Sequence, residues 1–306
     1  MFFQLYHKRN KPVSDFSCLQ TYYTRKNEMS YIRAEKWVIA TALDKFVLDG
    51  FRYCSKAKKG TRLLIQGLGC ESRIIWSAFV NEFLKLDITR DLIGFDVRGI
   101  GNSEGKPISF EQMVQDTVQI VKKEKPPIQL VGHSLGGLIA LKVAEKVPEV
   151  VDSVVLVCSN PQYSLKNKSG FVWRADQIVN NQMVSCIFDK VIPRSFSEKF
   201  INEHPEIICD FKNMLSRQSP TNYSILSRIA STADALDAFD KINIPVMMVV
   251  GNEDPNITFE KTREFALRRA AMVRVISGSG HNIPLENPIM LSKVIDRFNS
   301  IVSSIR

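Results

Sequence analysis

The sequence has few cysteines, and none of them is spaced for metal binding or redox chemistry. Its six cysteines are scattered along 306 residues, and no Cys-x-x-Cys pair occurs. Zinc sites and redox dithiols usually require such a pair, so we predict no metal site and no cofactor. Cysteines without a pairing pattern are typical of free thiols in a reducing compartment, and therefore favour an intracellular protein.

Long hydrophobic runs are also missing. No apolar run approaches the roughly 20 residues that a membrane-spanning helix needs. The apolar start, residues 1–6, is shorter than the hydrophobic core of a signal peptide, and charged residues follow at once. With 44% hydrophobic residues, the chain can still bury a substantial core. These features predict a globular intracellular protein, with the cytoplasm as the expected compartment.

Positive charge is concentrated at one end of the chain. The net charge is +9, and residues 1–60 hold twelve Lys and Arg against five Asp and Glu, whereas the remainder is nearly neutral. We interpret residues 1–35 as a basic N-terminal extension. Three roles are open for it: a solvated tail, a contact with an anionic membrane surface, or organelle targeting. Nucleic-acid binding is disfavoured because no recognition motif accompanies the charge.

Short apolar runs alternate with longer segments of helical character. This pattern is typical of a mostly parallel β-sheet with helices on both faces. The first two strands are expected to be antiparallel, with a turn near Asp49-Gly50. The sequence therefore predicts the α/β class and an eight-stranded sheet. The predicted strands are 37–41, 51–54, 63–65, 92–95, 128–131, 154–157, 246–250 and 273–276.

About 80 residues without a convincing strand separate the sixth and seventh predicted strands, which is too long for a plain connection. We predict a helical cap at 161–240, inserted into a core made of 36–160 and 241–306. Ser197 and Ser219 are suitable helix N-caps in it. Large apolar side chains at helical spacing usually form a cap's own core, but on its underside they would favour an acyl chain or an aromatic group: Phe171, Trp173, Met183, Phe188, Phe196, Phe200, Phe211 and Met214.

The most informative segment is Gly132-His133-Ser134-Leu135-Gly136. An apolar strand-like run precedes it and a helix-like run follows. A serine between two glycines at such a corner is exposed above the sheet, because flanking side chains would collide in so tight a turn. Ser134 is therefore the candidate nucleophile.

A serine hydroxyl needs a histidine to take its proton and a carboxylate to orient that histidine. Of the four histidines, His281 follows the last predicted strand and is the candidate base. Asp254 follows the seventh and is the candidate acid, with Glu253 as a rival. The segment after the sixth strand, 159–161, offers no carboxylate. His133 is expected to be structural and to point away from the site.

These segments resemble the α/β-hydrolase fold superfamily from about residue 36 to the C-terminus. The matching motifs are 132–137, 96–103, 251–254, and Gly280-His281 with Pro284 and Glu286 behind it. The resemblance implies a serine hydrolase that cleaves a carboxylic ester, such as an acyl ester, a lipid or a lactone, through an acyl-enzyme on Ser134. Its expected substrate is a small apolar ester or lipid. The chain is most similar to small-ester and acylglycerol hydrolases and enol-lactonases.

The same resemblance implies an oxyanion hole made by the backbone N–H groups of Leu68 and Leu135. Many superfamily members have His-Gly before this position, where the present chain has Gln66-Gly67. In the loop after the fourth strand, Asp96 and Arg98 are expected to be structural.

Other functions fit parts of the sequence. The segment 67–72 imitates a dinucleotide-binding fingerprint, but its third position is Ser72 rather than Gly or Ala. A thioesterase or a carbon–carbon bond hydrolase would use the same triad. A binding or signalling protein on the hydrolase scaffold would usually lack a triad member, and none is missing here.

Overall fold

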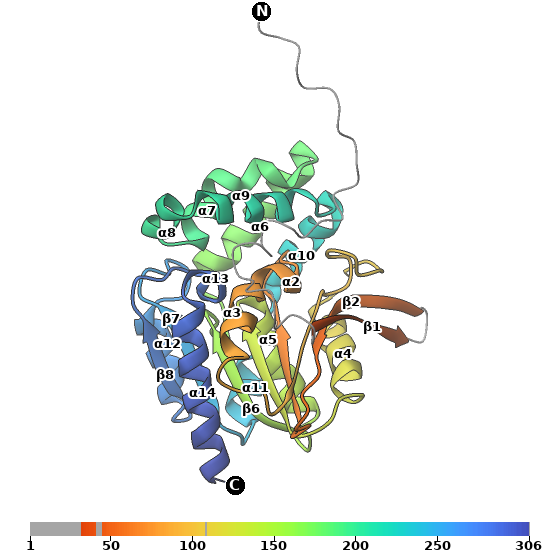
Figure 1. The fold of residues 1–306 in the computed structure, drawn as a ribbon. Helices are drawn as coiled ribbons and strands as arrows, with labels where there is room; N and C mark the ends of the chain where they lie inside the picture. Colours follow the sequence, from red (N-terminus) through yellow and green to blue (C-terminus); the bar gives the residue numbers. More distant parts are fainter. Residues whose placement is uncertain (1–31, 41–44, 108, 306) are drawn as a thin grey trace, which may run out of the picture. The chain divides into compact units, whose positions relative to one another are not determined.

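The computed structural model of the chain describes residues 32–40, 45–107 and 109–305. The described residues belong to one compact unit, which is shown in colour in Figure 1. Most of the predicted basic extension lies outside the described residues, so its contact with a membrane or its role in targeting stays a prediction. No described helix is both long and apolar enough to cross a membrane.

This unit is built on one eight-stranded sheet with the order β1-β2-β4-β3-β5-β6-β7-β8 (Figure 1). The pairs β1–β2 and β2–β4 are antiparallel, and all other pairs are parallel. The predicted α/β class and mostly parallel sheet are confirmed. The strands are β1 (Ile32–Ala40), β2 (Lys45–Tyr53), β3 (Thr61–Ile65), β4 (Asp91–Phe95), β5 (Ile128–His133), β6 (Val151–Val157), β7 (Val246–Gly251) and β8 (Met272–Ile276).

The predicted turn at Asp49-Gly50 is wrong, because both residues lie inside β2. Gly50 pairs with Glu35 of β1 and with Phe95 of β4. A Cβ atom at Gly50 would collide with the backbone of β4, so glycine is needed here for close strand approach rather than for a turn. β1 begins at Ile32, four residues before the predicted start of the core.

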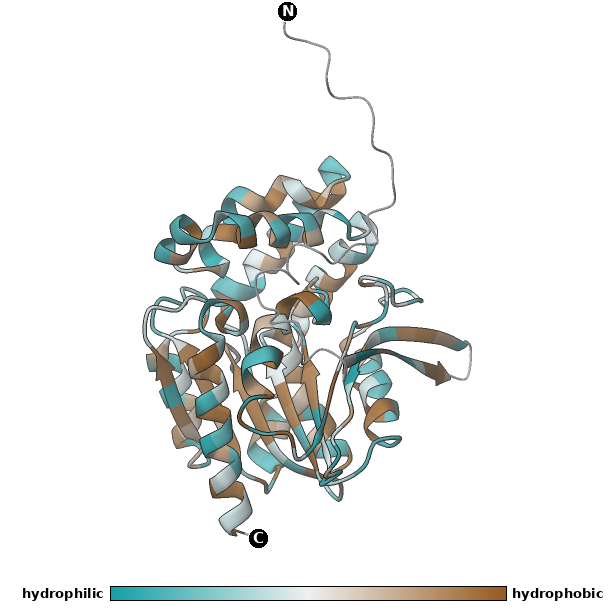
Figure 2. Ribbon diagram, in the orientation of Figure 1, coloured by the Kyte–Doolittle hydropathy of each residue, from teal (hydrophilic) through white to brown (hydrophobic). Residues whose placement is uncertain are grey.

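Helices cover both faces of the sheet (Figure 1). On one face α14 packs against α3, and on the other α5 packs against α4 and α11. The central strands are strongly hydrophobic (Figure 2), and β5, β6 and β7 are buried along their whole length. The helices of this layer are α2 (Ser72–Ile75), α3 (Ser77–Phe83), α4 (Phe110–Val121), α5 (Leu135–Lys146), α11 (Leu236–Lys241), α12 (Phe259–Leu267), α13 (Ile283–Glu286) and α14 (Pro288–Ile305).

Between β6 and β7 the chain forms a helical cap, which lies over one end of the sheet (Figure 1). The predicted N-caps form, since Ser197 Oγ accepts from Phe200 N and Ser219 Oγ accepts from Asn222 N. Several of the predicted apolar side chains pack inside the cap; Phe196, for example, stacks on Phe200. The cap helices are α6 (Leu165–Asn181), η2 (Val184–Ile187), α7 (Phe188–Ser195), α8 (Glu198–Glu203), α9 (Pro205–Ser216) and α10 (Pro220–Thr232).

A buried ion pair anchors the loop after β4. Arg98 donates from Nε and Nη2 to the two carboxylate oxygens of Asp116 at 2.8 and 2.7 Å, and both side chains are 3% exposed. The Arg98 guanidinium also lies 3.9 Å from the ring centre of Phe46. Asp96 is buried in the same loop, where its Oδ1 accepts from Ser72 N. These contacts agree with the expected structural role of Asp96 and Arg98.

We expect Asp116→Ala to lower the free energy of unfolding by about 3–5 kcal/mol, because it leaves the Arg98 charge buried without a partner. Urea unfolding followed by circular dichroism measures this. The matched control is Asp176→Ala, which breaks an exposed pair with Arg228 and should cost under about 1 kcal/mol. Equal losses in the two variants would contradict the structural role of the buried pair.

Candidate active site

The serine predicted as nucleophile lies at a strained corner between β5 and α5. Ser134 has φ 53° and ψ −120°, a conformation that side-chain-bearing residues rarely adopt. Cβ atoms at Gly132 and Gly136 would collide with the backbone of Gly136 and of Ile65. The two glycines therefore allow the tight turn, and the turn holds Ser134 at the carboxyl end of β5.

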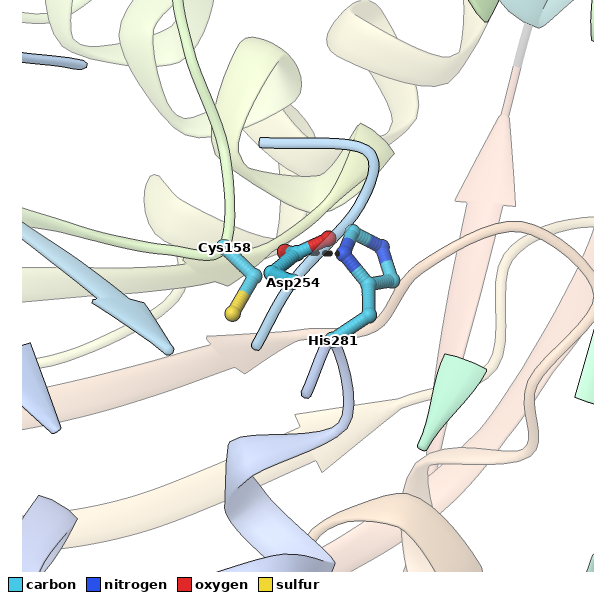
Figure 3. Close-up of side chains that lie close together, drawn as sticks. All are labelled: Cys158, Asp254 and His281. Carbon is cyan, nitrogen blue, oxygen red and sulfur yellow. Dashed lines mark hydrogen bonds and ion pairs between the residues drawn. The ribbon is translucent and has the colours of Figure 1, made fainter. Parts of the chain in front are cut away.

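The structure brings together the three side chains predicted from the sequence. His281 Nε2 lies 3.0 Å from Ser134 Oγ, and His281 Nδ1 lies 2.7 Å from Asp254 Oδ2. Figure 3 shows the contact between Asp254 and His281. Asp254 comes from the loop after β7 and His281 from the loop after β8. This chain of hydrogen bonds can move a proton from the serine to the imidazole while the carboxylate stabilises the resulting charge.

Asp254 is held in place by its own surroundings. It is 5% exposed, and its Oδ1 accepts from the backbone N–H groups of Asn256 and Ile257. The second oxygen is thereby directed at His281. Its sequence rival Glu253 is exposed, so Asp254 is the carboxylate that meets the imidazole.

The expectation that His133 points away from the site is wrong. Its ring lies 5.2 Å from the ring of His281 and lines the same cavity. His133 Nε2–H donates to the backbone oxygen of His281 at 2.8 Å, so this residue supports the loop that carries the candidate base. Complete burial lowers the pKa of His133 to about 3, which keeps its imidazole neutral.

The buried His133 should make stability fall in acid. Its folded pKa of about 3 lies below the ordinary value near 6.5, so below pH 6.5 the unfolded chain binds the proton more readily. Between pH 7 and pH 5 wild type should therefore lose roughly 2 kcal/mol more unfolding free energy than His133→Gln. Urea titrations at both pH values measure this difference. A wild-type loss no larger than that of His133→Gln would contradict a neutral, buried imidazole at this position.

Glu286 braces the loop that carries His281. Its Oε2 accepts from Gly280 N and from Ser197 N of the cap, both at 2.9 Å, and its Oε1 accepts from Asn282 N at 3.1 Å. The sequence marked Glu286 as part of a motif but gave no role for it. These bonds fix the backbone on both sides of His281 and tie it to the cap.

One cluster near the site contains potential metal ligands. The side chains of Cys158, Asp254 and His281 have ligand atoms within 4.8 Å of one another (Figure 3). However, the carboxylate already bonds His281 Nδ1, and burial raises the pKa of the Cys158 thiol well above its ordinary value. A protonated thiol is a poor metal ligand, so these donors suit a hydrogen-bonded pair better than a metal centre.

The two residues predicted to form the oxyanion hole, Leu68 and Leu135, stay a prediction; the structure gives their surroundings. Leu135 is the first residue of α5, where a backbone N–H has no acceptor within the helix. Leu68 lines the cavity, and the preceding Gly67 approaches so closely that its Cβ would lie 3.1 Å from Ser134 Cβ. Gln66 is 1% exposed, and neither of its amide atoms finds a hydrogen-bond partner among the described residues.

The dinucleotide alternative is disfavoured by the same region. A dinucleotide fold would place phosphate at the helix that starts after the glycine-rich loop. Here that helix is the four-residue α2, and its first N–H, from Ser72, already donates to the carboxylate of Asp96 at 2.5 Å. The position is therefore taken by a side chain of the protein.

Above Ser134 lies a cavity of about 440 Å³ that includes His281 and is roofed by cap residues such as Phe171 and Phe211. This volume suits a small organic molecule. The lining also includes Tyr163 and Arg174, which belong to no sequence motif named above.

Comparisons with known proteins agree with this architecture. The chain is 23% identical over 256 residues to the biotin biosynthesis bifunctional protein BioHC of Teredinibacter turnerae, covering 77% of this chain and 44% of that protein. It is 27% identical over 170 residues to 3-oxoadipate enol-lactonase 2 of Acinetobacter baylyi, covering 55% and 62%. The chain thus spans less than two thirds of these relatives.

Solved structures share the fold. A thermophilic esterase from Thermogutta terrifontis superimposes with a TM-score of 0.76 at 21% identity, covering 88% of this chain and 99% of the esterase. The enol-lactonase from Burkholderia xenovorans LB400 gives 0.76 at 19% identity, covering 86% and 100%. Residues 57–288 match the family described as serine aminopeptidase, S33. The chain therefore belongs to the serine aminopeptidase S33 family and has the α/β-hydrolase fold.

Proposed function

We propose that this protein is a serine hydrolase that cleaves carboxylic esters. The observation that carries the proposal is the hydrogen-bonded chain from Ser134 through His281 to Asp254 at the floor of the cavity. The relatives support it, since their names include an enol-lactonase and a pimeloyl-[acyl-carrier protein] methyl ester esterase from Wigglesworthia glossinidia brevipalpis.

In this mechanism Ser134 Oγ attacks the acyl carbon while His281 Nε2 takes the serine proton. The backbone N–H groups of Leu68 and Leu135 stabilise the negative oxygen of the tetrahedral intermediate. His281 then gives the proton to the leaving alcohol, and an acyl-enzyme remains on Ser134. A water molecule, deprotonated by His281, then attacks the acyl carbon and forms a second tetrahedral intermediate. When this intermediate breaks down, the acid is released and His281 returns the proton to Ser134 Oγ.

A fluorophosphonate probe tests this directly, because it reacts with activated serines. The probe should label wild type and leave Ser134→Ala unlabelled. Mass spectrometry of the labelled peptide should place the phosphonate on the peptide with Ser134. Equal labelling of both proteins would refute the proposed nucleophile. A panel of esters of graded chain length would then define the preferred acyl group.

A further inference from the structure

The charge of the cavity lining is one-sided. Four cationic residues line it, and no Asp or Glu is among its described lining residues. None of the four has a carboxylate oxygen within 4.0 Å in the described part of the chain. An organised group of cations without acidic partners creates a positive potential that attracts an anionic ligand. The four are Lys166, Arg174, Lys190 and Arg194.

These four cations differ in their exposure to solvent and in the contacts that they make within the protein. Lys166 and Lys190 are exposed, and Lys190 lies 4.4 Å from the ring centre of Trp173. Arg194 is half-buried but donates to the side-chain oxygen of Asn256 at 2.6 Å. Arg174 is half-buried, and its guanidinium lies 5.5 Å from the ring centre of Phe171. Arg174 also lies beside the hydroxyl of Tyr223, another residue of the cavity lining, so both its ring contact and its polar contact face the cavity. It is thus the inner cation best placed to meet a ligand.

A second feature beside Arg174 points to a ligand independently. Tyr163 lines the cavity and is 5% exposed, but its hydroxyl has no hydrogen-bond partner among the described residues. A buried donor without an acceptor is unfavourable, because it has lost its hydrogen bonds to water and gained none in return. Burial raises the pKa of this hydroxyl, and the effect is opposed by an approach to the Ser134 side chain, which falls short of hydrogen-bonding geometry, and by the charge of Arg174. Tyr163 therefore remains a donor. Its ring centre lies 5.1 Å from that of Phe171, the same ring that the Arg174 guanidinium approaches.

We propose that the cavity binds an ester that carries an anionic oxygen group, a carboxylate or a phosphate, and that Arg174 and Tyr163 bind this group. The inference rests on the proposed ester hydrolysis at Ser134, because it assigns the substrate of that site. Arg174 would supply the charge and two parallel N–H donors, and Tyr163 one O–H donor. Apolar side chains such as Phe211 and Leu215 would contact the rest of the substrate.

This proposal changes the substrate expected from the sequence. The cap's aromatic residues favoured an acyl chain or an aromatic group, within a small apolar ester or lipid, and Phe171 and Phe211 do line the cavity. The sequence does not predict that these cations line a cavity, because lysines and arginines on helices usually form a solvated face. Folding the cap over Ser134 places them around one volume, where their combined charge selects a substrate with an apolar part and an anionic end.

Monomethyl adipate and dimethyl adipate test the proposal, because they differ in one negative charge. Wild type should hydrolyse the monoester with the lower KM. Arg174→Gln should raise the KM for the monoester roughly 10- to 100-fold, as expected for a lost charge-assisted hydrogen bond, and should leave the diester within about threefold. Arg174→Lys should recover part of the loss. The matched control is Arg263→Gln, at an exposed arginine outside the cavity, which should behave as wild type.

Tyr163→Phe removes only the hydroxyl. It should raise the KM for monomethyl adipate and spare dimethyl adipate. A fall in kcat for both esters would instead show that Tyr163 serves the reacting groups and would remove it from the anion site. Competitive inhibition by adipate and by butyl phosphate then identifies the anion, because the stronger inhibitor carries the group that Arg174 accommodates better.

The inference and the proposed function can fail separately. If Ser134→Ala abolishes ester hydrolysis but Arg174→Gln leaves the monoester KM unchanged, the anion site is refuted and the hydrolase stands. If neither ester is turned over, calorimetric titration of adipate and of butyl phosphate into Ser134→Ala still tests the site without catalysis. Binding that disappears in the Ser134→Ala, Arg174→Gln double variant supports it. The absence of binding for both anions overturns it.

Discussion

Ser134→Ala should lower kcat for any ester substrate by about 10⁴-fold or more, because it removes the proposed nucleophile. His281→Ala should cost about as much, since the serine then keeps its proton. The structure supports equal effects, because His281 Nε2 lies 3.0 Å from the serine oxygen. Steady-state assays with purified variants, with kcat and KM separated, measure the effect.

The effects of Ser134→Ala and His281→Ala on kcat should not be additive. Because the serine and the histidine act as a unit, the double variant should be about as slow as either single variant. Ser300→Ala, at an exposed serine on α14, controls for handling and should match wild type. A Ser134→Ala protein that retains activity within about tenfold would show that another residue carries the reaction.

Asp254→Asn should lower kcat by about 10⁴-fold while the protein stays folded. The amide oxygen of asparagine can still accept from the N–H groups of Asn256 and Ile257, so the loop is expected to keep its shape. The amide group can no longer stabilise a positive imidazole, and it favours the wrong tautomer of His281. Kinetic assays combined with circular dichroism separate this loss from unfolding.

Glu253→Gln provides the matched control for Asp254→Asn. It makes the same change from carboxylate to amide one residue away, at an exposed side chain. We expect kcat to stay within about threefold of wild type, because no hydrogen bond links Glu253 to the imidazole. The reverse ranking of the two variants would move the acid from Asp254 to Glu253.

Much of the fold followed from the order of apolar runs along the chain. The runs that became β5, β6 and β7 are buried on both faces, and such strands appear in a sequence as continuous hydrophobic segments. The tight turn at Ser134 could also be predicted from the sequence, because such a turn requires small residues and glycines stand on both sides of the serine. The order of Ser134, Asp254 and His281, each following a strand, then predicted which side chains would meet.

By itself the sequence determined the layered fold and the three side chains that meet at Ser134, because both depend on local patterns and on where strands end. The tertiary structure decided features that depend on distant packing. Gly50 is needed because β4 approaches it, and His133 turns toward a backbone oxygen 148 residues away. The surroundings of Arg174 and Tyr163 depend on how the folded cap covers the sheet. The net charge around a cavity and the hydrogen bonds left unmade in it are set by residues that are distant in the sequence.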